Sequence, residues 1–232
     1  TVPTRTGYAF LGWSTSSTAT SATYQAGGSF ATNADTILYA VWKPNEYTVS
    51  YNAKGGSVAP AKQIKYHGIT LTLRSTIPTR NGYTFLGWAT SSTETSATYQ
   101  AGDSFTTNAD TTLYAVWKAN EYIVSYNANG GSGAPSNQIK YHGTALALSS
   151  TIPTRPGYTF LGWATAANAS SAAHQPGGMY TIDASTTLYA VWKNGNIVSG
   201  QCGDAVFYEL EVDQEYLTIY GMGDMWDWTY TN

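Results

Sequence analysis

The chain has 232 residues, of which only 11% are charged and 14% are aromatic. Its formal net charge of −3 is divided unevenly, because residues 1–193 carry +4 whereas residues 194–232 carry −7 and contain no Lys or Arg. The absence of a basic run argues against a nucleic-acid partner, and the single cysteine, Cys202, excludes both an internal disulfide and a cysteine-based metal site.

Two sequence markers recur along the chain with a fixed spacing of 75 residues. The first marker, Gly-Tyr-x-Phe-Leu-Gly-Trp, occupies residues 7–13, 82–88 and 157–163. The second marker, Leu-Tyr-Ala-Val-Trp, occupies residues 38–42, 113–117 and 188–192. A tandem array of this kind favours an extended architecture over a single catalytic site.

The repeat divides the chain into four parts. Residues 1–45 match the later part of a copy, residues 46–120 and 121–195 are complete copies, and residues 196–232 are an acidic tail. We interpret the tail as a cap or the start of a further domain. The chain opens in mid-repeat and shows no signal peptide, wall-sorting tail or membrane span, so we interpret it as part of a longer extracellular protein.

The first half of the copy 46–120 predicts short strands. Apolar and polar residues alternate over residues 47–51, which predicts a strand with one aromatic face. Gly55 and Gly56 then supply the positive φ angles of a tight turn. Residues 63–66 predict a second strand, and residues 71–73 fit either a strand or one turn of helix.

The second half of the copy contains both markers. Residues 83–88 are apolar on both faces, which predicts a central strand covered on each side. Gly87 in this strand leaves room for a group that presses on the backbone. Residues 89–98 predict a polar loop, residues 99–110 a short helical turn, and residues 113–117 a closing strand. The fold class is therefore mostly β, with α+β character in each unit.

The order of these motifs resembles the Listeria–Bacteroides repeat, a family that includes the B repeat of the internalins. The resemblance covers residues 1–195 and implies a tandem array of small β-grasp-like modules on the surface of a Gram-positive or gut bacterium. The tail is similar to the segment that precedes BspA-type leucine-rich repeats. Within it, residues 207–210 and 216–220 predict a C-terminal β-hairpin.

Aromatic residues are the first candidates for a binding site, because the apolar face of a sugar packs well on an aromatic ring. Six Trp residues recur at strand positions, and we interpret them as core; they are Trp13, Trp42, Trp88, Trp117, Trp163 and Trp192. Tyr24 and Tyr99 flank polar loops and are expected to be more exposed. Together with Thr95 and Thr98 they are the candidate ligand-binding residues.

Other polar residues favour structural roles. His67 and His142 lie in equivalent Tyr-His-Gly turns without further ligands in register, which favours a surface turn over a metal site. The segment 108–111 favours an Asx turn over a calcium loop. Lys43 and its equivalents follow the closing Trp, and we interpret them as exposed strand ends, not as partners in an isopeptide cross-link. We expect no catalytic site, cofactor or metal, because no motif for such chemistry is present.

The sequence is compatible with two functions. The first is a non-catalytic stalk that presents an adhesive or recognition domain at the bacterial cell surface, and the second is a multivalent binding module for a host or microbial glycan or protein. Self-association is a further hypothesis, because residues 1–45 lack the strand that other copies place at 47–51, leaving an open edge. Residues 197–199 or the tail hairpin of a neighbouring molecule are the candidate donors.

Overall fold

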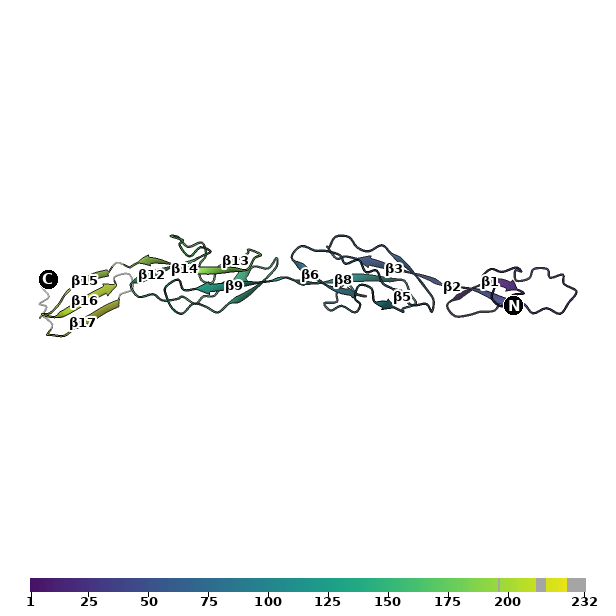
Figure 1. The fold of residues 1–232 in the computed structure, drawn as a ribbon, viewed down its shortest axis with the longest axis horizontal. Coiled ribbons are helices and arrows are strands. Elements are labelled where there is room, and N and C mark those ends of the chain that lie inside the picture. The colour runs from purple at the N-terminus through teal and green to yellow at the C-terminus, as the bar shows by residue number, and fades with distance from the viewer. Residues whose placement is uncertain (196, 212–215, 225–232) are drawn as a thin grey trace. The chain divides into compact units, whose positions relative to one another are not determined.

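The structure is a computed structural model that describes residues 1–195, 197–211 and 216–224. The chain forms two compact units, Thr1–Lys118 and Ala119–Asn232. Figure 1 shows that every labelled element is a strand. None of the described residues forms a helix, so none forms a helix long and apolar enough to cross a membrane.

The copy 46–120 is built on a four-stranded sheet with the order β4-β3-β8-β6. Its strands are β3 (Glu46–Asn52), β4 (Gln63–Tyr66), β6 (Tyr83–Ala89) and β8 (Thr111–Ala119). Strand β3 pairs antiparallel with β4 and parallel with β8. Two further strands, β5 (Leu71–Thr72) and β7 (Ser104–Phe105), form a small antiparallel pair.

The copy 121–195 repeats this arrangement with the sheet order β10-β9-β14-β12. Its strands are β9 (Glu121–Asn127), β10 (Gln138–Tyr141), β12 (Tyr158–Ala164) and β14 (Thr186–Asn194). Strands β11 (Leu146–Ala147) and β13 (Met179–Tyr180) form the second pair. The same topology in both copies follows from their shared sequence pattern.

The remaining strands lie at the two ends of the sequence. Residues 1–45 form a two-stranded antiparallel sheet of β1 (Tyr8–Ser14) and β2 (Tyr39–Pro44). The tail forms a three-stranded antiparallel sheet of β15 (Ile197–Gln201), β16 (Val206–Glu211) and β17 (Tyr216–Gly221). The tail hairpin is thus confirmed, with β15 as a third strand. Strand β15, a candidate donor for the open edge, is paired with β16 in its own chain.

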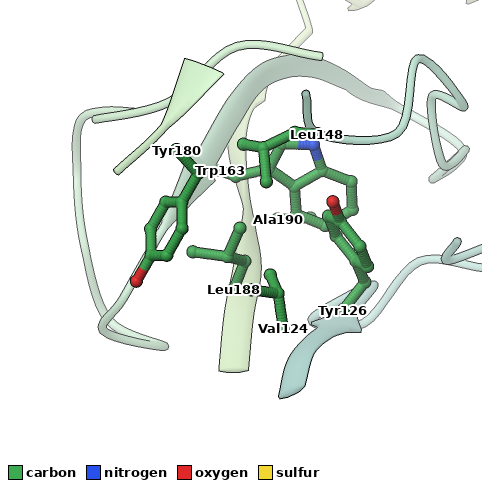
Figure 2. Close-up of a cluster of buried hydrophobic side chains, with 7 residues drawn as sticks. All are labelled: Val124, Tyr126, Leu148, Trp163, Tyr180, Leu188 and Ala190. Atoms are coloured by element: carbon green, nitrogen blue, oxygen red, sulfur yellow. The ribbon is translucent and has the colours of Figure 1, made fainter. Parts of the chain in front are cut away.

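Each complete copy has its own hydrophobic core. In the copy 121–195 the core consists of seven buried residues drawn in Figure 2: Val124, Tyr126, Leu148, Trp163, Tyr180, Leu188 and Ala190. The equivalent core of the copy 46–120 is formed by Val49, Leu73, Trp88, Phe105, Leu113 and Ala115. Since strand residues alternate between the two faces of a sheet, one face of each four-stranded sheet supplies this core.

Three predictions about the elements need correction. The helical turn predicted within residues 99–110 was wrong, because Ser104 and Phe105 form β7 and Phe105 is buried in the core. The central position predicted for residues 83–88 was also wrong, since β6 is an edge strand. Residues 71–72, which fitted either a strand or a turn of helix, form a strand. The mostly β fold is confirmed, whereas the α+β character predicted for each unit is not seen in the described residues.

The role predicted for Gly87 is confirmed. Its φ angle is +132°, and a Cβ atom placed on it would lie 2.5 Å from the carbonyl oxygen of Tyr99. The equivalent Gly12 and Gly162 occur at irregularities in the pairing of β1 and β12. The backbone that follows the polar loop therefore packs against this glycine in each copy. A side chain at the glycine position would push that backbone away from the strand.

Candidate functional site

The polar loop 89–98 is held at both ends by backbone hydrogen bonds. Trp88 N–H donates to the Tyr99 carbonyl at 2.7 Å, and Tyr99 N–H donates to the Trp88 carbonyl at 2.9 Å. Within the loop, Ser92 accepts a hydrogen bond through its carbonyl from Lys54 Nζ at 2.5 Å. The loop is thus positioned by the fold as well as by its own sequence.

The four candidate ligand-binding residues differ in exposure. Thr95 and Thr98 are exposed. Tyr99 is half-buried against Phe105, with 5.4 Å between ring centroids, and Tyr24 is half-buried in an equivalent contact with Phe30. The tyrosines therefore offer less surface to a ligand than their sequence context predicts, whereas both threonines face solvent.

The Trp residues of the complete copies serve the core. Trp88 and Trp163 are fully buried, and Figure 2 shows Trp163 surrounded by apolar side chains. The half-buried Trp117 and Trp192 donate through Nε1 to the carbonyls of Ala53 and Ala128, both at 2.9 Å. The core interpretation is confirmed for Trp88 and Trp163.

His67 lies at the junction between residues 1–45 and the copy 46–120. Its ring packs edge-on against Tyr8, with 5.6 Å between centroids, and its Nδ1 lies 3.2 Å from the hydroxyl oxygen of Tyr47. The ring occupies the space beside Gly7, where a Cβ atom would lie 2.1 Å from Nε2 of His67. His67 therefore joins two parts of the array, which is more than the surface turn predicted from its sequence.

The junction itself is a single residue. Strand β2 ends at Pro44 and β3 begins at Glu46. Asn45 N–H donates to the Gly7 carbonyl at 2.9 Å, and the Asn45 carbonyl accepts from His67 N–H at 2.9 Å. Asn45 is therefore hydrogen-bonded both to residues 1–45 and to the copy 46–120, the two parts that it connects.

Each complete copy also contains a buried lysine, which the sequence reasoning missed. Lys65 and Lys140 are each 1% exposed. Lys65 Nζ donates to the Asn108 side-chain oxygen at 2.7 Å and to the Tyr66 carbonyl at 2.9 Å. Lys140 Nζ donates to Asp183, which occupies the position of Asn108 in the next copy, and to the Tyr141 carbonyl at 3.2 Å.

The two lysine sites differ in charge. Asp183 pairs with Lys140 and also with His142, whose Nδ1 lies 3.0 Å from Oδ2. The hydrogen bond from Lys140 holds the pKa of the Asp183 carboxyl below its ordinary value. In the described part of the chain, no carboxylate lies within ion-pairing distance of Lys65. The strand sequence gave no signal for this burial, because its alternation places the apolar Ile64 and Tyr66 on the face opposite Lys65, and both of these apolar residues are 41% exposed.

The exposed lysine beside the closing Trp behaves as predicted. Lys43 forms an exposed ion pair with Glu46 at 2.9 Å, and this contact raises the pKa of Lys43. The described residues contain no group of three or more His, Cys, Asp or Glu that could hold a metal ion.

Comparison with known proteins identifies the repeat. The family model of the Listeria-Bacteroides repeat domain matches residues 1–41, 47–116 and 122–191. The chain belongs to this family. The buried Trp, the bulge glycine and the Gly-Gly turn of each complete copy are therefore parts of the Listeria-Bacteroides repeat.

Three curated proteins are similar in sequence to this chain. A protein of Evansella cellulosilytica named as a candidate membrane protein is 34% identical over 201 residues, covering 84% of this chain and 29% of the relative. A second protein of that organism, named as a candidate Gly-rich membrane protein, is 34% identical over 168 residues, covering 68% of this chain and 19% of the relative. Internalin H of Listeria monocytogenes is 34% identical over 88 residues, covering 38% of this chain and 15% of the relative. The chain thus spans less than a third of the length of each relative.

Proposed function

We propose that this array of Listeria-Bacteroides repeats is a non-catalytic spacer in an extracellular bacterial surface protein, where it presents an adhesive or recognition domain. The observation that carries the proposal is the one-residue junction at Asn45, which hydrogen-bonds to the residues on both sides of it. A spacer needs junctions that resist bending, so that its reach grows with the number of copies. The relatives named as membrane proteins and as an internalin support a location at the cell surface.

The packing of His67 supports the same role. Its ring fills the space beside Gly7 and contacts both Tyr8 and Tyr47, so three side chains would have to separate before the junction could bend. Aromatic contacts of this kind contribute about 1 kcal/mol each beyond the area that they bury. The junction is therefore stiffened by packing as well as by backbone hydrogen bonds.

The spacer function predicts that length scales with copy number. Deleting residues 46–120 removes one period and joins Asn45 directly to Glu121, which preserves the junction sequence. Small-angle X-ray scattering of the full chain and of this deletion should show a maximum dimension shorter by one repeat length. An unchanged maximum dimension, or a compact particle in both cases, would contradict the spacer function.

The alternative function is a multivalent binding module for a surface glycan or protein. The observation in its favour is that Thr95 and Thr98 are exposed on a loop whose ends are fixed by hydrogen bonds. Preorganisation of this kind lowers the entropic cost of binding. A glycan array tests this function, with Thr95→Ala and Thr98→Ala as the variants and Thr151→Ala, an exposed residue outside the loop, as the control. Binding that only the loop variants lose would favour the binding module over the spacer.

Self-association through the edge beside β1 and β2 also remains a proposal. Light scattering at high protein concentration provides the test, and a strictly monomeric chain would contradict it. We expect no nucleic-acid partner, because the sequence contains no run of basic residues.

A further inference from the structure

In the copy 46–120, a buried lysine contacts a side-chain carboxamide that lies far from it in the sequence. Lys65 comes from the edge strand β4, whereas Asn108 lies in the segment between β7 and β8, 43 residues further along the chain. The Lys65 side chain is removed from water, and its nitrogen lies 2.7 Å from the side-chain oxygen of Asn108. The fold therefore holds the lysine nitrogen within hydrogen-bonding distance of the oxygen of an acyl group.

We infer that Lys65 and Asn108 become joined by an intramolecular amide bond between Nζ and Cγ. Asn108 lies at the surface, where its side chain reaches the buried Lys65 nitrogen. Contact of the two groups within one folded repeat replaces a collision between separate molecules, and this proximity can raise the rate of a reaction by several orders of magnitude. The inference concerns a covalent modification of the repeat and does not depend on the spacer function proposed above.

A backbone donor polarises the acyl group. Gly68 N–H donates to the same Asn108 oxygen at 3.2 Å, so that this oxygen accepts hydrogen bonds from both Gly68 and Lys65. When Nζ attacks Cγ, negative charge develops on this oxygen. Fixed donors that face a developing oxyanion are among the largest contributors to catalysis of acyl transfer.

The reaction is balanced without an added reagent. The bond from Nζ to Cγ forms, and the bond from Cγ to Nδ2 breaks. The Lys65 ammonium passes two of its three protons to Nδ2, which leaves as an ammonium ion, and the new amide keeps the third proton on Nζ. Nothing is oxidised or reduced, so the step needs no cofactor.

The next copy provides an internal comparison. At Lys140 the acyl group is the carboxylate of Asp183, and the ion pair keeps this group ionised because it lowers the carboxyl pKa. A carboxylate is a much poorer acyl donor than a neutral carboxamide, since its negative charge repels the attacking lone pair. The inference therefore predicts one cross-link in the chain, in the copy 46–120, and an ion pair in the copy 121–195.

Mass spectrometry of the full chain tests the inference directly. We expect an intact mass below the sequence mass by about 17 Da, which is one ammonia. Tryptic digestion should yield a branched peptide in which residues 63–74, uncut after Lys65, are attached to residues 81–118. Lys65→Arg and Asn108→Ala variants should each have their own full sequence mass.

Two results would overturn the inference. One is a folded wild-type chain with its full sequence mass. The other is an ammonia loss without the branched peptide, because an Asn-Gly step such as Asn81-Gly82 loses the same mass when it cyclises to a succinimide.

A second variant tests the chemical argument in the other copy. Asp183→Asn recreates the lysine–carboxamide pair at Lys140, and we expect it to lose one further ammonia and to yield a branched peptide through Lys140. If Lys140 stays unmodified in this folded variant, contact and polarisation are insufficient for the reaction and the inference fails.

Discussion

Replacement of Gly7 by alanine tests how strongly His67 fixes the junction. Gly7 has a φ angle of +81°, and an added Cβ would lie 2.1 to 2.2 Å from three atoms of the His67 ring. Gly27 is the matched control, because its φ angle is +76° but nothing lies within 4 Å of the added Cβ. Both variants carry the backbone strain of a left-handed alanine, and only Gly7→Ala also displaces His67.

The expected magnitudes follow from these contacts. The left-handed conformation costs an alanine about 1 kcal/mol at either position. At Gly7 the His67 ring must also move by roughly 1 Å or more to regain ordinary van der Waals separation. This movement disrupts the contacts with Tyr8 and Tyr47, which contribute about 1 kcal/mol each. We therefore expect a loss of about 1 kcal/mol for Gly27→Ala and about 3 kcal/mol for Gly7→Ala.

Hydrogen exchange monitored by mass spectrometry measures this difference locally. The reporting peptide should contain Asn45, whose N–H donates to the Gly7 carbonyl. A second measurement in the His67→Ala background isolates the clash, because Gly7→Ala should then cost only the backbone strain of about 1 kcal/mol. Equal losses for the two glycine variants, or a Gly7→Ala cost that His67→Ala does not reduce, would refute the packing argument.

Three further predictions concern the core, the lysine site and the half-buried Tyr51. Trp88→Ala should lower the free energy of unfolding of its repeat by about 4 kcal/mol, whereas Leu86→Ala on the exposed side of β6 should cost about 1 kcal/mol; similar losses in chemical denaturation would contradict the assigned burial. Because the folded pKa of Asp183 is lowered, the stability from its ion pair is fully present above the ordinary carboxyl pKa and is lost as pH falls through the folded pKa. By NMR, the Gly143 amide, which donates to Asp183, should therefore titrate below that ordinary pKa, while the Gly68 amide, which donates to Asn108, should not show this titration. Tyr51→Phe removes the hydroxyl that donates to Gln63 at 2.6 Å and accepts from Arg74 N–H at 3.0 Å, and should cost about 1–2 kcal/mol in the same denaturation assay, a loss that Tyr47→Phe should not exceed.

The fold class and the position of most strands could be predicted from the sequence. Alternation over residues 47–51 is a local signal, and the structure places β3 there with Val49 in the core. The prediction for residues 83–88 failed because apolar residues on both faces of a strand indicate burial, not the order of strands in a sheet. The helical turn in 99–110 failed because Phe105 gains more by packing in the core beside Leu71 than local propensity can offset.

The features of the candidate site also divide into those that the sequence predicts and those that only the tertiary structure shows. The sequence by itself determined the repeat, its period and the family, because each of these is written in patterns of neighbouring residues. Only the tertiary structure placed the His67 ring against Gly7, and only it brought the buried Lys65 to Asn108 across 43 residues of chain. A contact between distant residues depends on the sheet order and the path of the loops, and no local pattern specifies either of these.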